Sequence, residues 1–193
     1  MELNTYPLVC TRGVVLYPNQ EIVIDVGRDT SVHAVENAQD NYDKKICLFS
    51  QKELEQEHPG VEDIYSVGTL CEVRHIRRFD NFLRVKFRGI KRVKLNKWVN
   101  GSLSDLAEVE VLESEKQDAV EEEALLRMIA DELDRMQGQE RFVTKEIVME
   151  ISKGMGGEFL SDKAVQGLPL DIERKQKYLE TLGWTGQELE EFL

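Results

Sequence analysis

Lysine and arginine side chains alternate with apolar ones along one stretch of the chain. Between residues 74 and 97 there are ten basic residues and a single acidic one, Asp80. Residues that alternate along a strand point to opposite faces, so the basic ones share one face of a sheet. A positively charged sheet face suits phosphate groups, as in oligonucleotide-binding barrels. We call the following residues the basic stripe: Arg84, Lys86, Arg88, Arg92 and Lys94.

Surfaces that bind nucleic acid interleave aromatic side chains with their cations, and the basic stripe lacks this arrangement. Phe87 alternates to the face opposite Arg84 and Lys86. Two other interpretations therefore stand beside nucleic-acid binding. One is a solvated face whose cations pair with acidic neighbours. The other is a surface that docks against acidic partners, including the acidic second half of this chain.

Patterns typical of catalysis are absent from the sequence. There is no G-x-x-x-x-G-K-[ST] phosphate loop, and the glycine-rich residues 154–157 are interpreted as a helix end. Two Ser–Lys pairs, Ser152 with Lys153 and Ser161 with Lys163, lie too close along a helix to face each other as a dyad. The three histidines lack metal-ligand spacing. We therefore expect no catalytic residue, metal or cofactor in this chain.

Aromatic residues stand at the ends of predicted strands. Tyr17 and Pro18 follow an apolar run, and Phe79 and Phe82 flank a predicted two-residue turn. Aromatic residues at strand ends often cover the end of a hydrophobic core. If they are exposed instead, they form an apolar patch suited to unfolded polypeptide. We predict that these four residues make apolar contacts with a bound polypeptide substrate.

The composition is that of a globular protein. Of the 193 residues 41% are hydrophobic and 32% charged, which excludes a disordered tail. The net charge of −12 argues against a general affinity for nucleic acid or anionic membranes. No apolar run approaches the ~20 residues of a membrane-spanning helix, and no signal peptide is recognisable. The three cysteines lie in apolar runs without C-x-x-C spacing, which predicts reduced, buried thiols in a cytoplasmic protein.

The first 113 residues follow the period-two alternation of strands. Strands are predicted over residues 21–26, 67–79, 82–88 and 90–97. Gly89 is expected to separate the last two, and a phase slip predicts a β-bulge near His75. A helix is expected to begin near Asp29. Short strands at this spacing indicate a strongly curved antiparallel sheet or a small barrel.

From residue 114 the apolar period becomes helical. One of the predicted helices follows Asp171 and includes Tyr178 and Leu179, and a last helix is still running at Leu193. We therefore expect the chain to continue in a longer parent. The charge divides at the same point, with a net charge of −3 over residues 1–113 and −9 over residues 114–193. These ranges are the two predicted domains.

Several ordered motifs are similar to those of one family. Residues 7–18 resemble a P-L-R-G-x-V-x-F-P segment, with Cys10-Thr11 in place of the usual Pro-Leu, and residues 25–31 are similar to the segment that follows it. Residues 62–69 match ED-x-x-x-VGT, and residues 83–93 match LRV-x-x-x-G-x-x-R. Residues 168–180 resemble an LP…KQ-x-x-LE run. Together these motifs resemble the N-terminal domain of bacterial ATP-dependent Lon proteases.

The resemblance implies an α+β fold, in which a β-rich pseudo-barrel with one helix precedes an all-α helical bundle. It implies a non-catalytic module that recognises unfolded or damaged polypeptides and helps a homo-hexamer assemble. ATP and Mg²⁺ are then needed only by the ATPase domain of the parent, which also holds the Ser–Lys protease. A free-standing adaptor of the same fold and nucleic-acid binding through the basic stripe are the alternatives.

Overall fold

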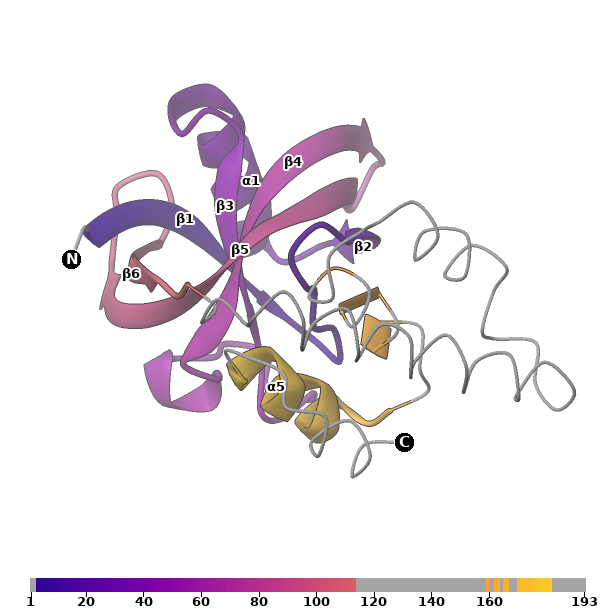
Figure 1. Ribbon diagram of the computed structural model, residues 1–193. Coiled ribbons are helices and arrows are strands. Elements are labelled where there is room, and N and C mark those ends of the chain that lie inside the picture. Colours follow the sequence, from indigo (N-terminus) through magenta and orange to yellow (C-terminus); the bar gives the residue numbers. More distant parts are fainter. Residues whose placement is uncertain (1–2, 114–158, 160–161, 164, 167–169, 182–193) are drawn as a thin grey trace, which may run out of the picture. The chain divides into compact units, whose positions relative to one another are not determined.

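The computed structural model describes residues 3–113, 159, 162–163, 165–166 and 170–181. This part of the chain is β-rich with few helices (Figure 1). Its elements are β1 (Leu3–Thr11), β2 (Glu21–Val26), α1 (Asp29–Asn41), β3 (Lys45–Ser50), the 3₁₀ turn η1 (Val61–Asp63), β4 (Val67–Arg78), β5 (Leu83–Val99), β6 (Leu106–Val111) and α5 (Ile172–Glu180). Most of the helical bundle predicted for residues 114–193 lies outside the described residues.

The long strand β5 closes the sheet on itself. The strand order is β2-β5-β4-β3-β1-β6, and β5 pairs with β6 as well. One edge of β5 pairs with β4, and the other pairs first with β2 and then with β6. Five strands therefore form a ring, and β2 lies outside it. The predicted curved sheet is confirmed, although β1 and β3 pair in parallel.

The β4–β5 pairing shifts register twice, once between Leu70 and Cys71 and once between Val73 and His75. The second shift confirms the predicted bulge near His75. The predicted break at Gly89 is wrong, because β5 runs through this residue without interruption. A Cβ on Gly89 would lie 2.1 Å from the carbonyl oxygen of Tyr17. Glycine at this position thus permits the close approach of another backbone segment rather than ending the strand.

Two apolar clusters form the core of residues 3–113, which we call the β-domain. One lies beneath α1, whose Ala34, Val35 and Ala38 are fully buried. The other is formed by side chains from β1, β3, β4, β5 and β6. The three cysteines are buried and free, as predicted. Burial raises the pKa of the Cys10 thiol to about 12, and it raises the pKa values of Cys47 and Cys71 as well.

Helix α5 packs with the β-domain, although its residues fall within the predicted helical domain. The chain divides into two compact units, one made of residues 1–113 with 172–180, the other of residues 114–171 with 181–193. The Gln176 amide nitrogen (Nε2) donates to the carbonyl oxygen of Val67 at 2.8 Å. Nε of Arg92 donates to the carbonyl oxygen of Leu179 at 3.1 Å. Polar contacts thus attach α5 to β4 and β5.

Candidate functional site

A two-residue turn ends the β4–β5 hairpin and exposes a pair of aromatic side chains. The backbone N–H of Phe79 donates to the carbonyl oxygen of Phe82 at 2.9 Å, which leaves Asp80 and Asn81 as the turn, as predicted. The two phenyl rings are stacked, with centroids 4.6 Å apart and planes at 12°. Both side chains are half-buried, so part of each ring faces solvent.

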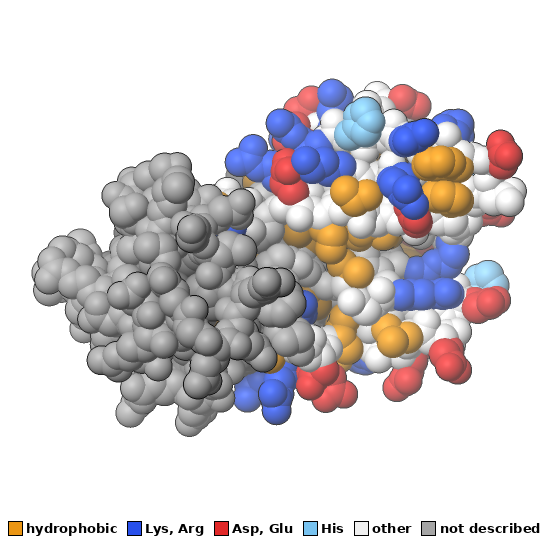
Figure 2. Space-filling view, turned by 90° about the vertical axis from the view of Figure 1, so that its right-hand side faces the viewer, with side chains coloured by type: hydrophobic (Ala, Val, Ile, Leu, Met, Phe, Trp, Pro, Cys, Tyr) orange, Lys and Arg blue, Asp and Glu red, His pale blue; other side chains and the backbone are white. Residues whose placement is uncertain are grey.

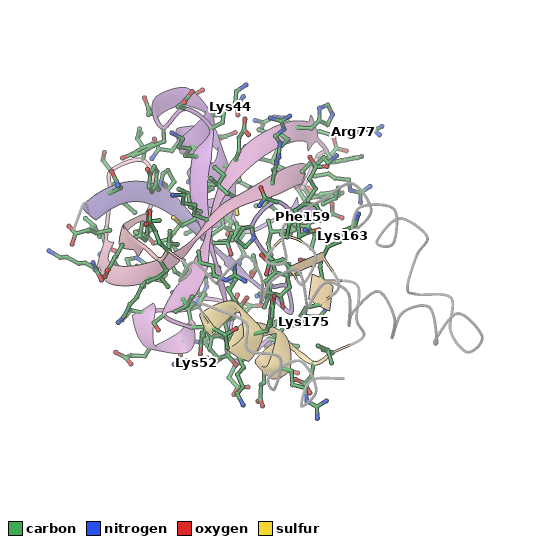
Figure 3. The ribbon with its side chains drawn as sticks, viewed as in Figure 1. Lys44, Lys52, Arg77, Phe159, Lys163 and Lys175 are labelled. Atoms are coloured by element: carbon green, nitrogen blue, oxygen red, sulfur yellow. The ribbon has the colours of Figure 1, made fainter. Side chains whose placement is uncertain are left out.

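Two arginines border this ring pair. Arg77 and Arg84 are direct cross-strand partners, and their guanidinium groups lie 5.0 and 5.4 Å from the Phe79 centroid. Figure 1 shows β4 and β5 extending side by side as an arm, and Figure 3 places Arg77 near its end. On the surface in Figure 2, hydrophobic side chains adjoin Lys and Arg side chains. We call the four residues Arg77, Phe79, Phe82 and Arg84 the aromatic tip.

An acidic side chain on β2 allows two arginines to stand opposite each other. Like charges directly across a sheet are destabilising. Nε and one terminal nitrogen of Arg84 each donate to an oxygen of Asp25 at 2.7 Å. These hydrogen bonds hold the pKa of the Asp25 carboxyl below its usual value. The bidentate pair fixes the Arg84 guanidinium in position beside the rings.

The basic stripe is divided rather than continuous. Arg84 pairs with Asp25, and Lys86 pairs with Glu21 at 2.6 Å, as the interpretation of a paired solvated face predicts. Arg88 and Lys94 are exposed, but Arg92 is only 4% exposed. Placing Arg92 on an open face was therefore wrong, because α5 covers it. A buried or acid-paired cation offers little to a phosphate backbone, and nucleic-acid binding is not favoured.

Tyr17 and Pro18 are buried, which corrects the prediction that they contact a polypeptide at an exposed loop tip. The Tyr17 hydroxyl donates to the carbonyl oxygen of Lys175 at 2.9 Å, and its ring meets that of Tyr178. The segment also passes close to Gly89. Tyr17 and Pro18 therefore belong to the packing between the β-domain and α5.

Two further surface residues were not singled out from the sequence. Val23 is 56% exposed and lies opposite Lys86 on the same outer face. Arg77 belongs to the basic run 74–97, but its place beside Phe79 depends on the strand register. The alternation of Glu21, Val23 and Asp25 was a signal for the outer face of β2.

Most of the residues weighed for catalysis lie outside the described part of the chain. These include Ser152, Lys153, Ser161 and the glycine-rich residues 154–157. Within the described residues, no three His, Cys, Asp or Glu side chains are grouped so that they could hold a metal ion. No helix in this part is both long and apolar enough to cross a bilayer.

Comparison with known families matches residues 5–185 to the substrate-binding domain of ATP-dependent protease La (LON). The Lon protease of Brevibacillus choshinensis is 31% identical over 177 residues, which cover 91% of this chain and 23% of that protein. The Lon protease of Syntrophomonas wolfei is 33% identical over 183 residues, covering 93% of this chain and 22% of that protein. The chain thus spans less than a quarter of the length of these relatives.

Two solved structures share the fold. The N-terminal domain of the Mycobacterium avium complex Lon protease superposes with a TM-score of 0.71 at 20% identity, covering 96% of this chain and 93% of that one. The Lon N-terminal domain protein from Xanthomonas campestris superposes with a TM-score of 0.67 at 16% identity, covering 98% and 96%. At these identities the likeness concerns the fold alone.

Proposed function

Because the chain belongs to the family of LON substrate-binding domains, we propose that it binds unfolded or damaged polypeptides through its aromatic tip. The chain is the recognition part of a Lon-type protease and does not itself cleave. Apolar side chains that folded proteins bury are exposed in unfolded chains, and exposed aromatic rings contact them without requiring a particular sequence.

The single observation that carries this proposal is the half-exposed Phe79–Phe82 stack beneath two guanidinium groups. A stacked pair offers a flat apolar surface, and cations beside it attract further aromatic rings. Its position at the end of the β4–β5 arm makes it accessible to a long, irregular ligand. Figure 3 places Arg77, at the arm, well apart from Lys175 on α5.

The parent protein is proposed to be an ATP-dependent serine protease that assembles as a homo-hexamer in the cytoplasm. ATP and Mg²⁺ are proposed to act in its ATPase domain and not in this chain. We also propose that residues 114–193 include a helical bundle that connects residues 1–113 to the rest of the parent. The family membership and the extent of the relatives support this view.

The proposal is tested by titrating the 193-residue chain into fluorescein-labelled α-lactalbumin that has been reduced and carboxymethylated, so that it stays unfolded. We expect a saturable rise in fluorescence anisotropy, and no rise with labelled native α-lactalbumin. No rise with the unfolded protein up to about 0.1 mM chain would contradict the proposal, since that limit corresponds to a binding free energy of only about −5.5 kcal/mol.

A further inference from the structure

Among the described residues, strand β2 has a hydrogen-bonded neighbour strand on one side only. Each of the other described strands pairs with at least two neighbours, whereas β2 pairs with β5 alone. The second edge of β2 therefore presents a row of backbone donors and acceptors that no described strand uses. A free edge of this kind is a template for another extended chain.

The register shows which backbone groups face this open edge. Gly89 donates its N–H to the carbonyl oxygen of Gln20 at 2.9 Å, so residue 20 bonds toward β5. The pairing continues without a shift through β2, and bonding direction alternates along an antiparallel strand. Ile22 and Ile24 therefore bond toward β5. Val23 and its neighbours at positions 21 and 25 direct their N–H and C=O groups away from it.

The side chains along this edge are only partly covered. Ile22 and Ile24 point toward the core but remain half-buried. On the outer face, exposed Val23 stands between the acidic side chains of Glu21 and Asp25. A strand added here would cover the isoleucines on one face and place side chains opposite an acid, a valine and a second acid on the other.

The open edge leads directly to the aromatic tip. Gly27 directly follows β2, whose last pair is Val26 with Leu83, and it lies beside Phe82. A Cβ built on Gly27 would lie 3.8 Å from the Cβ of Phe82, in ordinary contact. Because Gly27 has no side chain, one from a neighbouring strand can reach across it onto the phenyl ring, as cross-strand aromatic side chains do over glycine.

We propose that an extended polypeptide segment adds to the free edge of β2 as a further strand and places an aromatic side chain over Gly27 against Phe82. This inference rests on the proposed function and names how the polypeptide is held. Backbone hydrogen bonds supply affinity that does not depend on sequence. The side chains select segments in which an aromatic residue is followed, at alternate positions, by a cation facing Asp25, an apolar residue facing Val23 and a cation facing Glu21.

Charge gives the edge its selectivity. Asp25 already pairs with Arg84 directly opposite it on β5, and Glu21 pairs diagonally with Lys86. A cation on the added strand would give each acid a second basic partner. An acidic residue in the same place would face a carboxylate across the strand gap, which is destabilising. The occupant is therefore an extended segment with basic and apolar side chains, not an acidic one.

The test uses the 193-residue chain and a short fluorescein-labelled peptide with phenylalanine, lysine, valine and lysine at alternate positions, separated by threonine. A second peptide keeps these side chains but carries N-methyl groups on alternate residues. It is made in two versions, one methylated at the odd positions and one at the even positions, so that each edge of the peptide strand is blocked in one version. In the protein, Val23→Pro removes one outward N–H without touching a β2–β5 hydrogen bond, and proline is tolerated at a free edge. Val23→Ala is the matched control, because it shortens the same side chain and keeps the N–H.

We expect Val23→Pro to weaken peptide binding about tenfold or more, the equivalent of one or two backbone hydrogen bonds, and Val23→Ala to weaken it less than about threefold. One N-methylated version should bind far more weakly than the parent peptide, and replacing lysine by glutamate should also weaken binding. Equal binding of the parent peptide and both N-methylated versions would overturn the inference, even if Val23→Pro failed to fold. If the parent peptide and both N-methylated versions bind equally but Phe79→Ser abolishes binding, the β2 edge is excluded and the proposed function stands. If neither the peptides nor an unfolded protein bind, both fail.

Discussion

The ring of Tyr17 meets the ring of Tyr178 edge to face, with centroids 5.2 Å apart and planes at 81°. The Tyr17 hydroxyl also donates to the backbone of α5 at Lys175. A residue near the start of the chain is thus buried by a helix that lies 158 positions further along. This contact joins α5 to the β-domain and removes Tyr17 from the side chains that a bound polypeptide can reach.

Substitution of Tyr17 should affect stability and not polypeptide binding. Tyr17→Phe keeps the ring but loses the hydroxyl bond, so we expect a loss of about 1 kcal/mol in the free energy of unfolding. Tyr17→Ser removes a fully buried ring and should cost about 3–5 kcal/mol. Urea unfolding followed by circular dichroism measures both. If the Tyr17→Ser chain kept its stability but no longer bound unfolded protein, Tyr17 would be a surface residue that contacts the polypeptide.

Arg92 should behave as a structural residue although it belongs to the basic stripe. Its Nε donates to the carbonyl oxygen of Leu179, and its guanidinium lies 5.8 Å from the Tyr178 centroid. Arg92→Met should lower the unfolding free energy by about 1.5–3 kcal/mol, the range for a hydrogen bond to a charged group. The exposed Lys94 is the matched control, and Lys94→Met should change stability by less than about 0.5 kcal/mol. Equal effects of the two substitutions would show that the contact between Arg92 and α5 does not stabilise the fold.

Gly89 should not tolerate a side chain. Gly89→Ala would place a methyl group 2.1 Å from the carbonyl oxygen of Tyr17, and we expect the resulting backbone shift to cost about 1–3 kcal/mol. Gly60→Ala is the control, since its nearest neighbour atom would be 3.7 Å away. Thermal unfolding of the two variants should separate them by several degrees. A Gly89→Ala chain as stable as the Gly60→Ala chain would contradict the close approach.

The cysteine thiols should resist alkylation in the folded chain. The thiolate is the reactive form, and burial raises the pKa of Cys10 from 9.0 to about 12, so at pH 8 the thiolate fraction falls steeply on folding. Burial raises the pKa values of Cys47 and Cys71 in the same direction. Iodoacetamide at pH 8, followed by mass spectrometry, should modify all three thiols in urea and almost none in buffer. A thiol that reacts equally fast in both conditions is not buried as described.

The alternation of residue types predicted the local structure of the β-domain well. It located β2 to the residue, the bulge beside His75 and the turn between Phe79 and Phe82. These features depend on residues close together in the sequence. The period of a strand and the residue types of a turn are set by such neighbouring residues, so both can be recognised in the sequence.

Burial by distant segments was the part that the sequence could not predict. Tyr17 and Arg92 are covered by α5, and nothing in their own neighbourhoods indicates that helix. Gly89 suggested a strand end because its role, the approach of another backbone, depends on tertiary packing. The open edge of β2 likewise follows from which strands pair and not from its own residues.

Binding of unfolded polypeptide at the aromatic tip requires its two phenyl rings, and a double substitution removes both. Phe79→Ser with Phe82→Ser removes both half-exposed rings, whereas Leu103→Ser removes a 61% exposed side chain from the loop at the other end of β5. Anisotropy of labelled, carboxymethylated α-lactalbumin gives the affinity of each chain. We predict at least a tenfold loss for the double variant, equivalent to about 1.4 kcal/mol, and no change for Leu103→Ser. Unchanged binding by a folded double variant would contradict binding through the aromatic tip.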